Sequence, residues 1–253
     1  MPPSRTLQQV QDWIAGARRI VVLTGAGIST DSGIPDFRGP QGVWTRNPAA
    51  EKLSTLQNYL ADRDVRVAAW QSRMAHPAWT AQPNRAHRAL VGLERRGRLH
   101  ALITQNIDEL HQMAGHDPAR VIEVHGTMRR AMCWGCGLRM PMSEVLERVQ
   151  AGEADPPCRV CGGILKSDTI SFGQALVPSV IARAMAAAGE ADLLLAIGST
   201  LQVYPVAGVV PVAKEAGAKV VIVVDQATPM DELADAVLRD PIGDVLPALC
   251  DAS

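Results

Sequence analysis

The segment that most constrains the fold is residues 19–39, RIVVLTGAGISTDSGIPDFRG. Its apolar run IVVL predicts a strand buried on both faces, as in the middle of a parallel sheet. Gly25 and Gly27 follow at a strand-to-helix turn, where backbone N–H groups can approach a ligand closely, and the next residues, Ser29 and Thr30, suit a helix cap. This pattern predicts a phosphate-binding turn. A tight turn without a ligand is the alternative, because Thr30 replaces the third glycine of the dinucleotide fingerprint.

Residues 33–39 continue this segment as a loop bounded by Gly and Pro. In it, Asp36, Phe37 and Arg38 place a carboxylate, an aromatic ring and a guanidinium side by side. Packing alone does not require that mixture, and loops held by a rigid scaffold often carry function. The continuation therefore favours a ligand over a bare turn.

The composition limits the classes of partner. The chain has 253 residues, 47% of them hydrophobic, which is enough for one or two domains with a full core. A net charge of −1 argues against general attraction to nucleic acid or to an anionic membrane. The N-terminus lacks the apolar core of a secretion signal, and no run approaches the roughly 20 apolar residues of a spanning helix. We expect a cytoplasmic location, in which the cysteines serve as metal ligands or free thiols.

Strands alternate with helices along most of the chain. Besides the first strand, apolar runs predict strands at 99–104, 120–125, 191–197 and 219–224. Helical spacing and caps predict helices at 6–17, 84–93, 179–188 and 206–216, and a last helix from residue 234 onward. This order predicts an α/β fold with a Rossmann-like, mostly parallel, doubly wound sheet.

Two segments interrupt the alternation. Residues 39–83 predict an inserted helical module, and residues 127–165 contain the paired cysteines. We expect these two insertions to form one smaller domain. The remaining segments, 1–38, 84–126 and 166–253, then form the Rossmann-like domain.

The cysteines form two C-x-x-C pairs, Cys133 with Cys136 and Cys158 with Cys161, separated by 21 residues. This spacing is close to that of a zinc ribbon. Four thiolates suit tetrahedral zinc, and a closed set of four ligands leaves no position for chemistry. A redox dithiol and an iron–sulfur cluster are alternatives. An insertion with little core of its own favours structural zinc.

Polar residues follow two of the predicted strands. Gln105, Asn106 and Asp108 come after 99–104, and His125 ends 120–125. The carboxyl ends of parallel strands face the ligand crevice of such a sheet. His125 suits a general base, because the unperturbed pKa of histidine is about 6.5. For Asp108, helix capping is the alternative.

These motifs resemble those of the sirtuin family of NAD-dependent protein deacylases, in the same order and over most of the chain. They are GAGISTDSGIPDFRG, TQNID at 104–108, HG at 125–126, the two C-x-x-C pairs, FG at 172–173 and GSTLQVYPVAG at 198–208. The resemblance implies NAD and zinc as cofactors and acyl-lysine proteins or peptides as partners. It also implies an acyl-lysine tunnel between a Rossmann-like domain and a smaller zinc-binding and helical domain.

In this family the amide oxygen of the acyl-lysine attacks the nicotinamide ribose, which releases nicotinamide, deacylated lysine and O-acyl-ADP-ribose. The resemblance implies that His125 deprotonates a ribose hydroxyl and that Asn106 is also catalytic. It implies NAD contacts for Gly25, Ala26, Gly27, Ser29, Asp36, Phe37, Arg38, Trp44, Gln105, Asn106, Ile107, Asp108, Gly198, Ser199, Thr200 and Asp225. It implies substrate contacts for Phe172, Gly173, Leu201 and Val203, which would hold the peptide as an added strand.

The chain departs from the family pattern at three points. Asp225 stands where the family usually has Asn; a carboxylate can hold ribose hydroxyls but would repel a 2′-phosphate, which favours NAD over NADP. Ser199 and Thr200 exchange the order of two hydroxyl residues. Gln174 replaces the usual Glu, so the charge that would favour basic flanking residues in a substrate is lost.

The acyl group and the reaction class have alternatives. Members that prefer acidic acyl groups carry Tyr-x-x-Arg, and the nearest match is Trp70 with Arg73, in which Trp cannot donate as a phenol does. We interpret Arg73 as an exposed helical residue and expect deacetylation. The alternatives are protein ADP-ribosyl transfer, a nicotinamide-dependent dehydrogenase, and a zinc-ribbon interaction module. The missing third glycine disfavours the dehydrogenase, and His125 with Asn106 disfavours the interaction module.

Overall fold

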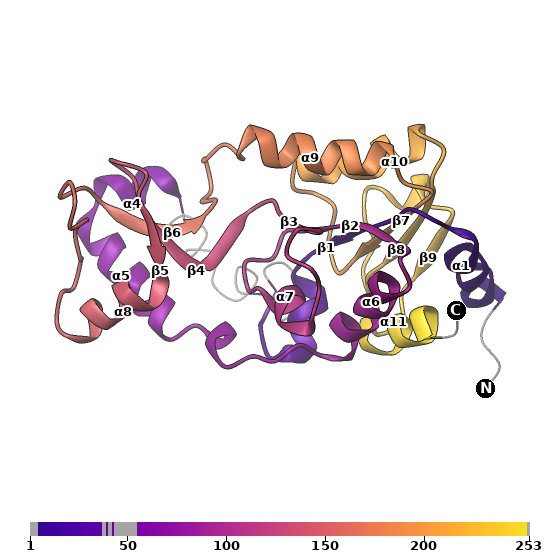
Figure 1. Cartoon of the computed structure of the whole chain (residues 1–253), viewed down its shortest axis with the longest axis horizontal. Helices are drawn as coiled ribbons and strands as arrows, with labels where there is room; N and C mark the ends of the chain where they lie inside the picture. Colours follow the sequence, from indigo (N-terminus) through magenta and orange to yellow (C-terminus); the bar gives the residue numbers. More distant parts are fainter. Residues whose placement is uncertain (1–4, 37–38, 40–41, 43–54, 252–253) are drawn as a thin grey trace.

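The computed structural model describes residues 5–36, 39, 42 and 55–251. Three of the residues expected to contact NAD, Phe37, Arg38 and Trp44, lie outside these ranges. The described chain forms two lobes joined by extended segments (Figure 1). The larger lobe contains a six-stranded sheet and the smaller lobe a three-stranded sheet.

All neighbouring strands of the larger sheet are parallel. In spatial order they are β3 (Val121–Glu123), β2 (Leu99–Thr104), β1 (Ile20–Thr24), β7 (Leu193–Ile197), β8 (Lys219–Val223) and β9 (Ala236–Leu238). The chain moves from β1 outward to β3 and then returns to β7 on the other side of β1. The strand order therefore reverses between β1 and β7, and the expected Rossmann-like parallel sheet is confirmed.

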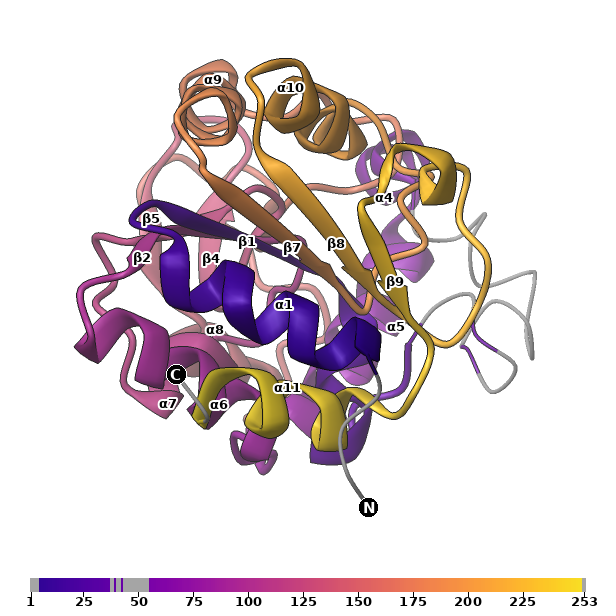
Figure 2. The ribbon, with the colours of Figure 1, turned by 90° about the vertical axis from the view of Figure 1, so that its right-hand side faces the viewer.

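Helices cover both faces of this sheet (Figure 2). One layer consists of α1 (Arg5–Gly16), α6 (Arg85–Arg95) and α11 (Ile242–Asp251), and the other of α9 (Pro178–Gly189), η3 (Val206–Gly208) and α10 (Val209–Glu215). Alternate residues of β1 enter the two cores: Ile20 and Val22 pack in the first, and Val21 and Leu23 in the second. A strand buried on both faces must be apolar throughout, which explains the run IVVL.

The first turn of α6 has the cap that its sequence predicts. Asn84 accepts hydrogen bonds from the backbone N–H groups of Ala86, at 2.9 Å, and His87, at 3.3 Å. In return, the N–H of Asn84 donates to Nδ1 of His87 at 3.4 Å. This reciprocal arrangement is a capping box that fixes where the helix begins.

Two expectations about the elements are wrong. Residues from 234 onward do not form a single helix, because Ala236–Leu238 pair with β8 as strand β9 before α11 begins. A three-residue strand shows no periodicity, and its neighbour decides its conformation. Ser29 and Thr30 do not cap a helix; they lie inside the 3-10 helix η1 (Ala26–Ser32), whose N-cap is Gly25.

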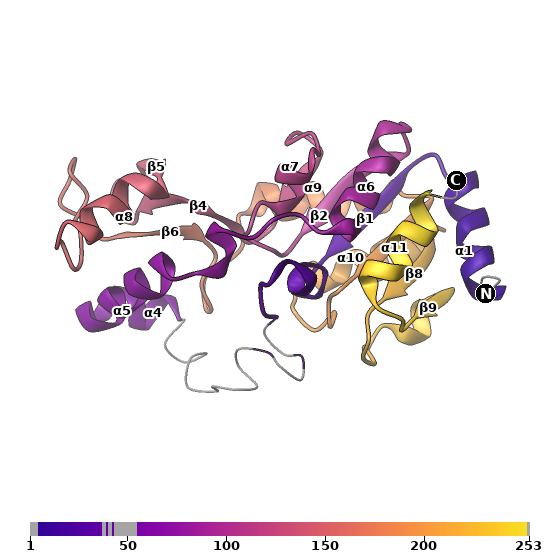
Figure 3. The same cartoon turned by 90° about the horizontal axis from the view of Figure 1, so that it is seen from below.

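The smaller lobe is built on an antiparallel sheet in the order β5 (Arg139–Pro141), β4 (Gly126–Cys133) and β6 (Leu165–Thr169). Its helices are α4 (Leu56–Ala61), α5 (Arg63–Met74) and α8 (Met142–Gln150) (Figure 3). The core of this lobe packs Trp70 of α5 against Val145, Leu165 and Cys133. This packing supports our proposal that the two insertions form one domain.

The remaining short elements are η2 (Pro77–Trp79), α7 (Leu110–Ala114) and η4 (Asp231–Leu233). Among the described residues, no helix has both the length and the apolar character needed to cross a membrane.

Candidate active site and metal centre

The polar residues that follow the strands gather at one edge of the larger sheet. β1 leads into Gly25, β2 into Gln105, β3 into His125 and β7 into Gly198. Parallel strands end together at this edge, and doubly wound folds bind ligands where the strand order reverses, here between β1 and β7. We call this edge the strand-end crevice.

Three glycines allow the turns after β1 and β7 to touch. The N–H of Gly25 donates to the carbonyl of Ile197, and the N–H of Gly27 to that of Gly198, both at 2.9 Å. A Cβ atom on Gly25 would lie 2.7 Å from the carbonyl oxygen of Gly198. Gly198 has a φ of 62°, and its Cβ would lie 2.5 Å from the nitrogen of Ile28. The N–H groups of Gly25 and Gly27 therefore join the two turns, and the contact of these glycines with NAD stays a prediction.

Asn106, Asp108 and Ser29 form a buried polar group beside these turns. Ser29 Oγ donates to Asp108 Oδ2 at 2.8 Å, and Asn106 Nδ2 donates to Ser29 Oγ and to the carbonyl of Gly25, each at 3.2 Å. Asp108 also accepts the N–H of Leu110 at 3.0 Å, so the helix-capping alternative is present as well. Burial raises the pKa of Asp108, and these hydrogen bonds partly oppose the rise.

Gln105 links the ends of β2, β3 and β7. Its side-chain Nε2 donates to Ser199 Oγ at 2.8 Å, and its backbone oxygen lies 2.9 Å from Nδ1 of His125. A carbonyl oxygen only accepts, so Nδ1 of His125 carries a proton and Nε2 of the neutral ring keeps its lone pair. Burial lowers the pKa of His125, and the bond to Gln105 partly opposes this. The imidazole of His125 is therefore neutral at neutral pH, with Nε2 able to accept a proton.

The chain after His125 crosses into the smaller lobe. Gly126 has a φ of 72°, and a Cβ atom there would collide with the carbonyl oxygen of Asp168. The N–H of Ile170 donates to the carbonyl of His125 at 2.9 Å. Only glycine at position 126 allows the chain to pass from His125 into β4 this close to the end of β6.

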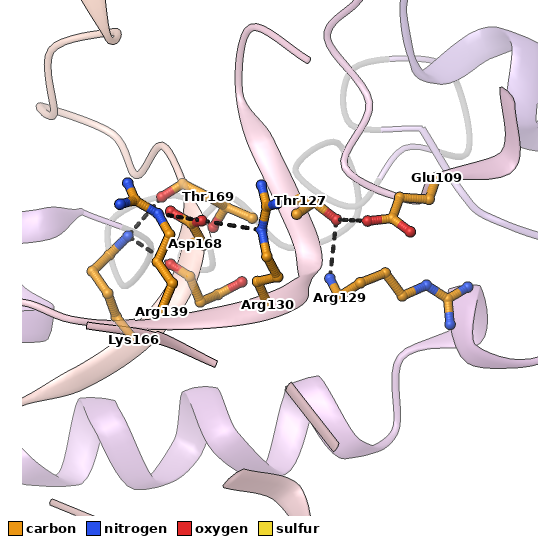
Figure 4. Close-up of polar contacts among 9 residues, drawn as sticks. Glu109, Thr127, Arg129, Arg130, Arg139, Lys166, Asp168 and Thr169 are labelled. Atoms are coloured by element: carbon orange, nitrogen blue, oxygen red, sulfur yellow. Dashed lines mark hydrogen bonds and ion pairs between the residues drawn. The ribbon is translucent and has the colours of Figure 1, made fainter. Parts of the chain in front are cut away.

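Polar contacts then hold the beginning of β4 and the end of β6 in place (Figure 4). They join Thr127 to Glu109 at 2.6 Å, Arg139 to Asp168 at 2.9 Å, Arg130 to Asp168 at 3.4 Å, and Lys166 to the carbonyl of Thr169 at 2.6 Å. These contacts fix the direction in which the strand leaves the crevice.

Two carboxylates near the crevice were not predicted. Glu109 adopts a φ of 61° and accepts from Thr127. Glu123 of β3 has a buried oxygen, Oε1, without a hydrogen-bond partner in the described chain. Burial, with the nearby carboxylate of Glu109, raises the pKa of Glu123 to about 7. In the sequence, Glu123 is only a polar position in a short strand, so no signal distinguishes it.

The four paired cysteines converge in the smaller lobe. Sγ of Cys133 lies 3.4 Å from that of Cys161, Sγ of Cys136 lies 3.8 Å from that of Cys158, and all four lie within 4.8 Å of one another. Sulfurs bound tetrahedrally to zinc at about 2.3 Å lie about 3.8 Å apart, so this group fits a zinc ion. The four thiolates fill the coordination of that ion, which supports a structural role.

Further predicted NAD contacts lie around the same edge. Asp225 is exposed after β8, and Thr200 is half-buried after β7. Ala26 and Ile107 are half-buried in the turns after β1 and β2. Asp36 accepts the N–H of Gly39 at 3.1 Å.

The residues expected to hold a peptide differ in accessibility. Phe172 is exposed and its carbonyl accepts the N–H of Leu56 at 2.9 Å, while Gly173 follows with a φ of 77°. Leu201 is 2% exposed and Val203 packs against the same core. The side chain of Leu201 therefore belongs to the core, and only its backbone is available to a peptide.

The pair considered for acidic acyl groups lies in the smaller lobe. Trp70 is 2% exposed and belongs to the core of that lobe. Arg73 is half-buried, which corrects its interpretation as an exposed residue. Its carbonyl accepts the indole N–H of Trp79 at 2.6 Å, at the end of α5.

Comparisons with known proteins agree with this geometry. The sequence profile of the Sir2 family matches residues 25–205. The chain is 50% identical over 236 residues to NAD-dependent protein deacetylase 2 of Streptomyces coelicolor, covering 93% of this chain and 98% of that protein. It is 44% identical over 245 residues to the NAD-dependent protein deacetylase of Rhodopseudomonas palustris, covering 96% and 95% of the two.

Solved structures give the same result. A Sir2 variant with a deacetylated p53 peptide and 3′-O-acetyl ADP-ribose superposes with a TM-score of 0.89 at 30% identity, over 98% of both chains. A second Sir2 enzyme superposes with a TM-score of 0.88 at 36% identity, again over 98% of both. Sequence, strand order and the four-cysteine centre agree in placing this chain in the Sir2, or sirtuin, family.

Proposed function

We propose that the strand-end crevice binds NAD and an acylated lysine and that His125 is the general base. The chain is an NAD-dependent protein deacetylase, the name that its curated relatives carry. When bound, NAD supplies a cleavable bond between nicotinamide and ribose. The residues of the chain bind and orient the two reactants and accept the proton.

The observation that carries the proposal is the hydrogen bond between Nδ1 of His125 and the carbonyl of Gln105. It fixes the tautomer, so Nε2 is the atom that accepts a proton from a ribose hydroxyl. The lowered pKa keeps this nitrogen unprotonated at neutral pH. Gln105 thus orients the base through its backbone carbonyl, while its side chain donates to Ser199 and joins two strand ends.

The buried polar group suits the nicotinamide and ribose portions of NAD. An ionised carboxylate has about four lone-pair positions, so Asp108 can accept a carboxamide N–H in addition to its bonds from Ser29 and Leu110. Asn106 can orient a ribose hydroxyl or a water molecule. At the other end, Asp225 can accept from the hydroxyls of the adenosine ribose and would repel a 2′-phosphate.

We propose acetyl-lysine as the preferred substrate. Solved Sir2 structures similar to this chain contain a deacetylated p53 peptide and a propionylated peptide. Recognition of an acidic acyl group would need a phenol and a guanidinium that both reach the ligand. Trp70 instead packs in the core of the smaller lobe.

Replacing the base tests the proposal. His125→Ala should lower the rate of deacetylation of an acetyl-lysine peptide by at least about 100-fold, because general base catalysis contributes that much. NAD binding, measured by calorimetry, should persist because Asn106 and Asp108 remain.

The matched control is His100→Ala. His100 lies near the start of β2, at the end of the strand away from the crevice, and pairs with Glu190 at 3.2 Å. This variant should deacetylate at the wild-type rate. Wild-type turnover by His125→Ala, or no uptake of NAD by the wild-type protein, would contradict the proposal.

A further inference from the structure

Three histidines outside the proposed catalytic groups lie buried side by side next to β1 and β2. His87 belongs to α6, His111 to α7, and His116 follows α7; they are 0%, 1% and 3% exposed. The ring centroids of His87 and His111 are 4.9 Å apart, and those of His111 and His116 are 5.7 Å apart. We call these residues the histidine cluster.

Each ring of the histidine cluster leaves one buried nitrogen without a hydrogen-bond partner among the described residues. These atoms are His87 Nε2, His111 Nδ1 and His116 Nε2. Unpaired polar atoms in the interior are costly, and native proteins normally satisfy them with protein groups or ordered water. Three unpaired nitrogen atoms in neighbouring rings indicate that one ligand binds to all three histidines.

The partners of two rings determine where their protons lie. Nδ1 of His87 faces the backbone N–H of Asn84 at 3.4 Å, so it accepts and the proton of the neutral ring is on Nε2. Nδ1 of His116 lies 2.5 Å from a carboxylate oxygen of Glu94, which can only accept, so the proton is on Nδ1. The unpaired atoms are therefore a donor on His87 and an acceptor on His116.

His111 supplies a second acceptor. Its Nε2 lies 3.0 Å from Oγ1 of Thr24, whose hydroxyl donates to Oγ1 of Thr104 at 2.9 Å. Nε2 of His111 then donates to Thr24, and Nδ1 keeps its lone pair. Burial lowers the pKa of all three histidines, that of His87 to about 4, so the rings are neutral.

We propose that the histidine cluster binds one buried water molecule, and that this water completes a hydrogen-bonded chain ending at the backbone N–H of Asn106. Water accepts from His87 and donates to His111 and His116, which satisfies all three atoms. If the Thr24–Thr104 bond ran in the opposite direction, the same water would accept two bonds and donate one. Three hydrogen bonds is the usual number for a buried water.

Cations do not fit this set of atoms. A transition metal needs a lone pair from each ring, but Nε2 of His87 carries a proton because Nδ1 is already an acceptor. An ammonium ion has no lone pair to accept from His87. The chemistry of the donors and acceptors therefore selects a neutral molecule that both donates and accepts.

The chain of bonds reaches the proposed active site through two threonines. His111 contacts Thr24, Thr24 donates to Thr104, and Oγ1 of Thr104 accepts the N–H of Asn106 at 3.1 Å. Thr24 ends β1 and Thr104 ends β2, so these bonds fix the two strand ends relative to each other. His111 is thus a positioning residue for Asn106, a role that rests on the proposed function.

The water itself is tested without any assay of activity. In a crystal structure of the full chain at a resolution that shows ordered water, we expect one water within hydrogen-bond distance of all three rings. Nitrogen NMR should show protons on Nε2 of His87, Nδ1 of His116 and Nε2 of His111, and metal analysis should give one zinc per chain. No water between the rings, a proton on Nδ1 of His87, or a second metal ion would overturn the proposal.

The positioning role is tested with two variants of one residue. His111→Leu should lower kcat about tenfold at saturating NAD, because small displacements of orienting groups slow catalysis. His111→Gln, which can still donate to Thr24, should recover most of kcat. Both are measured at a temperature where circular dichroism shows the native fold, with His100→Ala as the control.

The result separates the two proposals. A merely structural role would lower thermal stability in His111→Leu and leave kcat unchanged in the folded protein, which would contradict the positioning role. If the wild-type chain showed no deacetylation at all, the proposed function would fail, while the crystallographic and NMR results would still decide on the water.

Discussion

Burial shifts the pKa values of the ionisable groups around the strand-end crevice in opposite directions. It lowers the pKa of His125, because the charged form of histidine is the protonated one. It raises the pKa of Asp108 and Glu123, because their charged forms are the deprotonated ones. Burial therefore disfavours the charged form of each of these groups, next to the site proposed for cleavage of the bond between ribose and the nicotinamide ring.

Glu123 makes stability depend on pH. Its pKa is raised from 4.5 to about 7, so the folded chain binds this proton more tightly than the unfolded chain. The stability that Glu123 contributes is fully present below the pKa of its unfolded state. It is lost as the pH rises through the pKa of the folded state, between about pH 5 and about pH 8. The free energy of unfolding, measured with urea, should decline over this pH range in the wild type and decline less in Glu123→Gln. Parallel curves would contradict the assigned pKa.

Several residues could be assigned from the sequence because their signals are local. Asn84 precedes a helical pattern, and the cysteine pairs have the spacing of a zinc ribbon. The histidine cluster could not be found this way, because it brings residues 87, 111 and 116 together by packing α6 against α7. The same holds for Gly25 and Gly27, whose N–H groups bond to a turn about 170 residues later in the chain.

At the scale of elements, α6 depends on its N-cap residue, Asn84. Asn84 caps the helix and also donates to the carbonyl of Ile28 at 2.8 Å and to Ser32 Oγ at 3.0 Å, so it ties α6 to η1. Asn84→Ala should lower the free energy of unfolding by about 1–2 kcal/mol. The control Gln71→Ala, at an exposed position of α5, should change it by less than about 0.5 kcal/mol. If urea unfolding showed the same loss of unfolding free energy in Asn84→Ala and Gln71→Ala, the capping role would be contradicted.

The strands show where prediction from sequence ends. β1, β2, β7 and β8 are strands of at least five residues, most of them apolar, and they were predicted because burial on both faces favours that composition. β9 is three residues long at the edge of the sheet, and only its pairing with β8 makes it a strand. Long buried elements are specified locally, whereas short edge elements are specified by their neighbours.

At the scale of the molecule, the two lobes differ in what stabilises them. The larger lobe has an apolar core on each face of its sheet, whereas the core of the smaller lobe is small and includes Cys133 and Cys158 themselves. A domain of this kind depends on its metal. Removing zinc with a strong chelator, or Cys136→Ser, should make residues 127–165 sensitive to protease and abolish deacetylation, while the larger lobe stays protected.

Cys250 provides the matched control for this prediction. It is buried in α11, in the larger lobe, and it is not part of the four-cysteine group. Cys250→Ser should keep one zinc per chain and wild-type protection of residues 127–165. Full deacetylation by metal-free protein would show that the ion is not needed for the fold of the smaller lobe.

The most direct test of His125 as the base is the pH dependence of kcat/KM for deacetylation, which reports the free enzyme. Activity requires the neutral imidazole, and burial lowers the pKa of His125 below its usual 6.5, so the rate should fall only below that pH. Glu123→Gln, which removes a second group that titrates near neutrality, should keep the same acid limb. An acid limb at or above pH 6.5, or one that shifts in Glu123→Gln, would contradict the assignment.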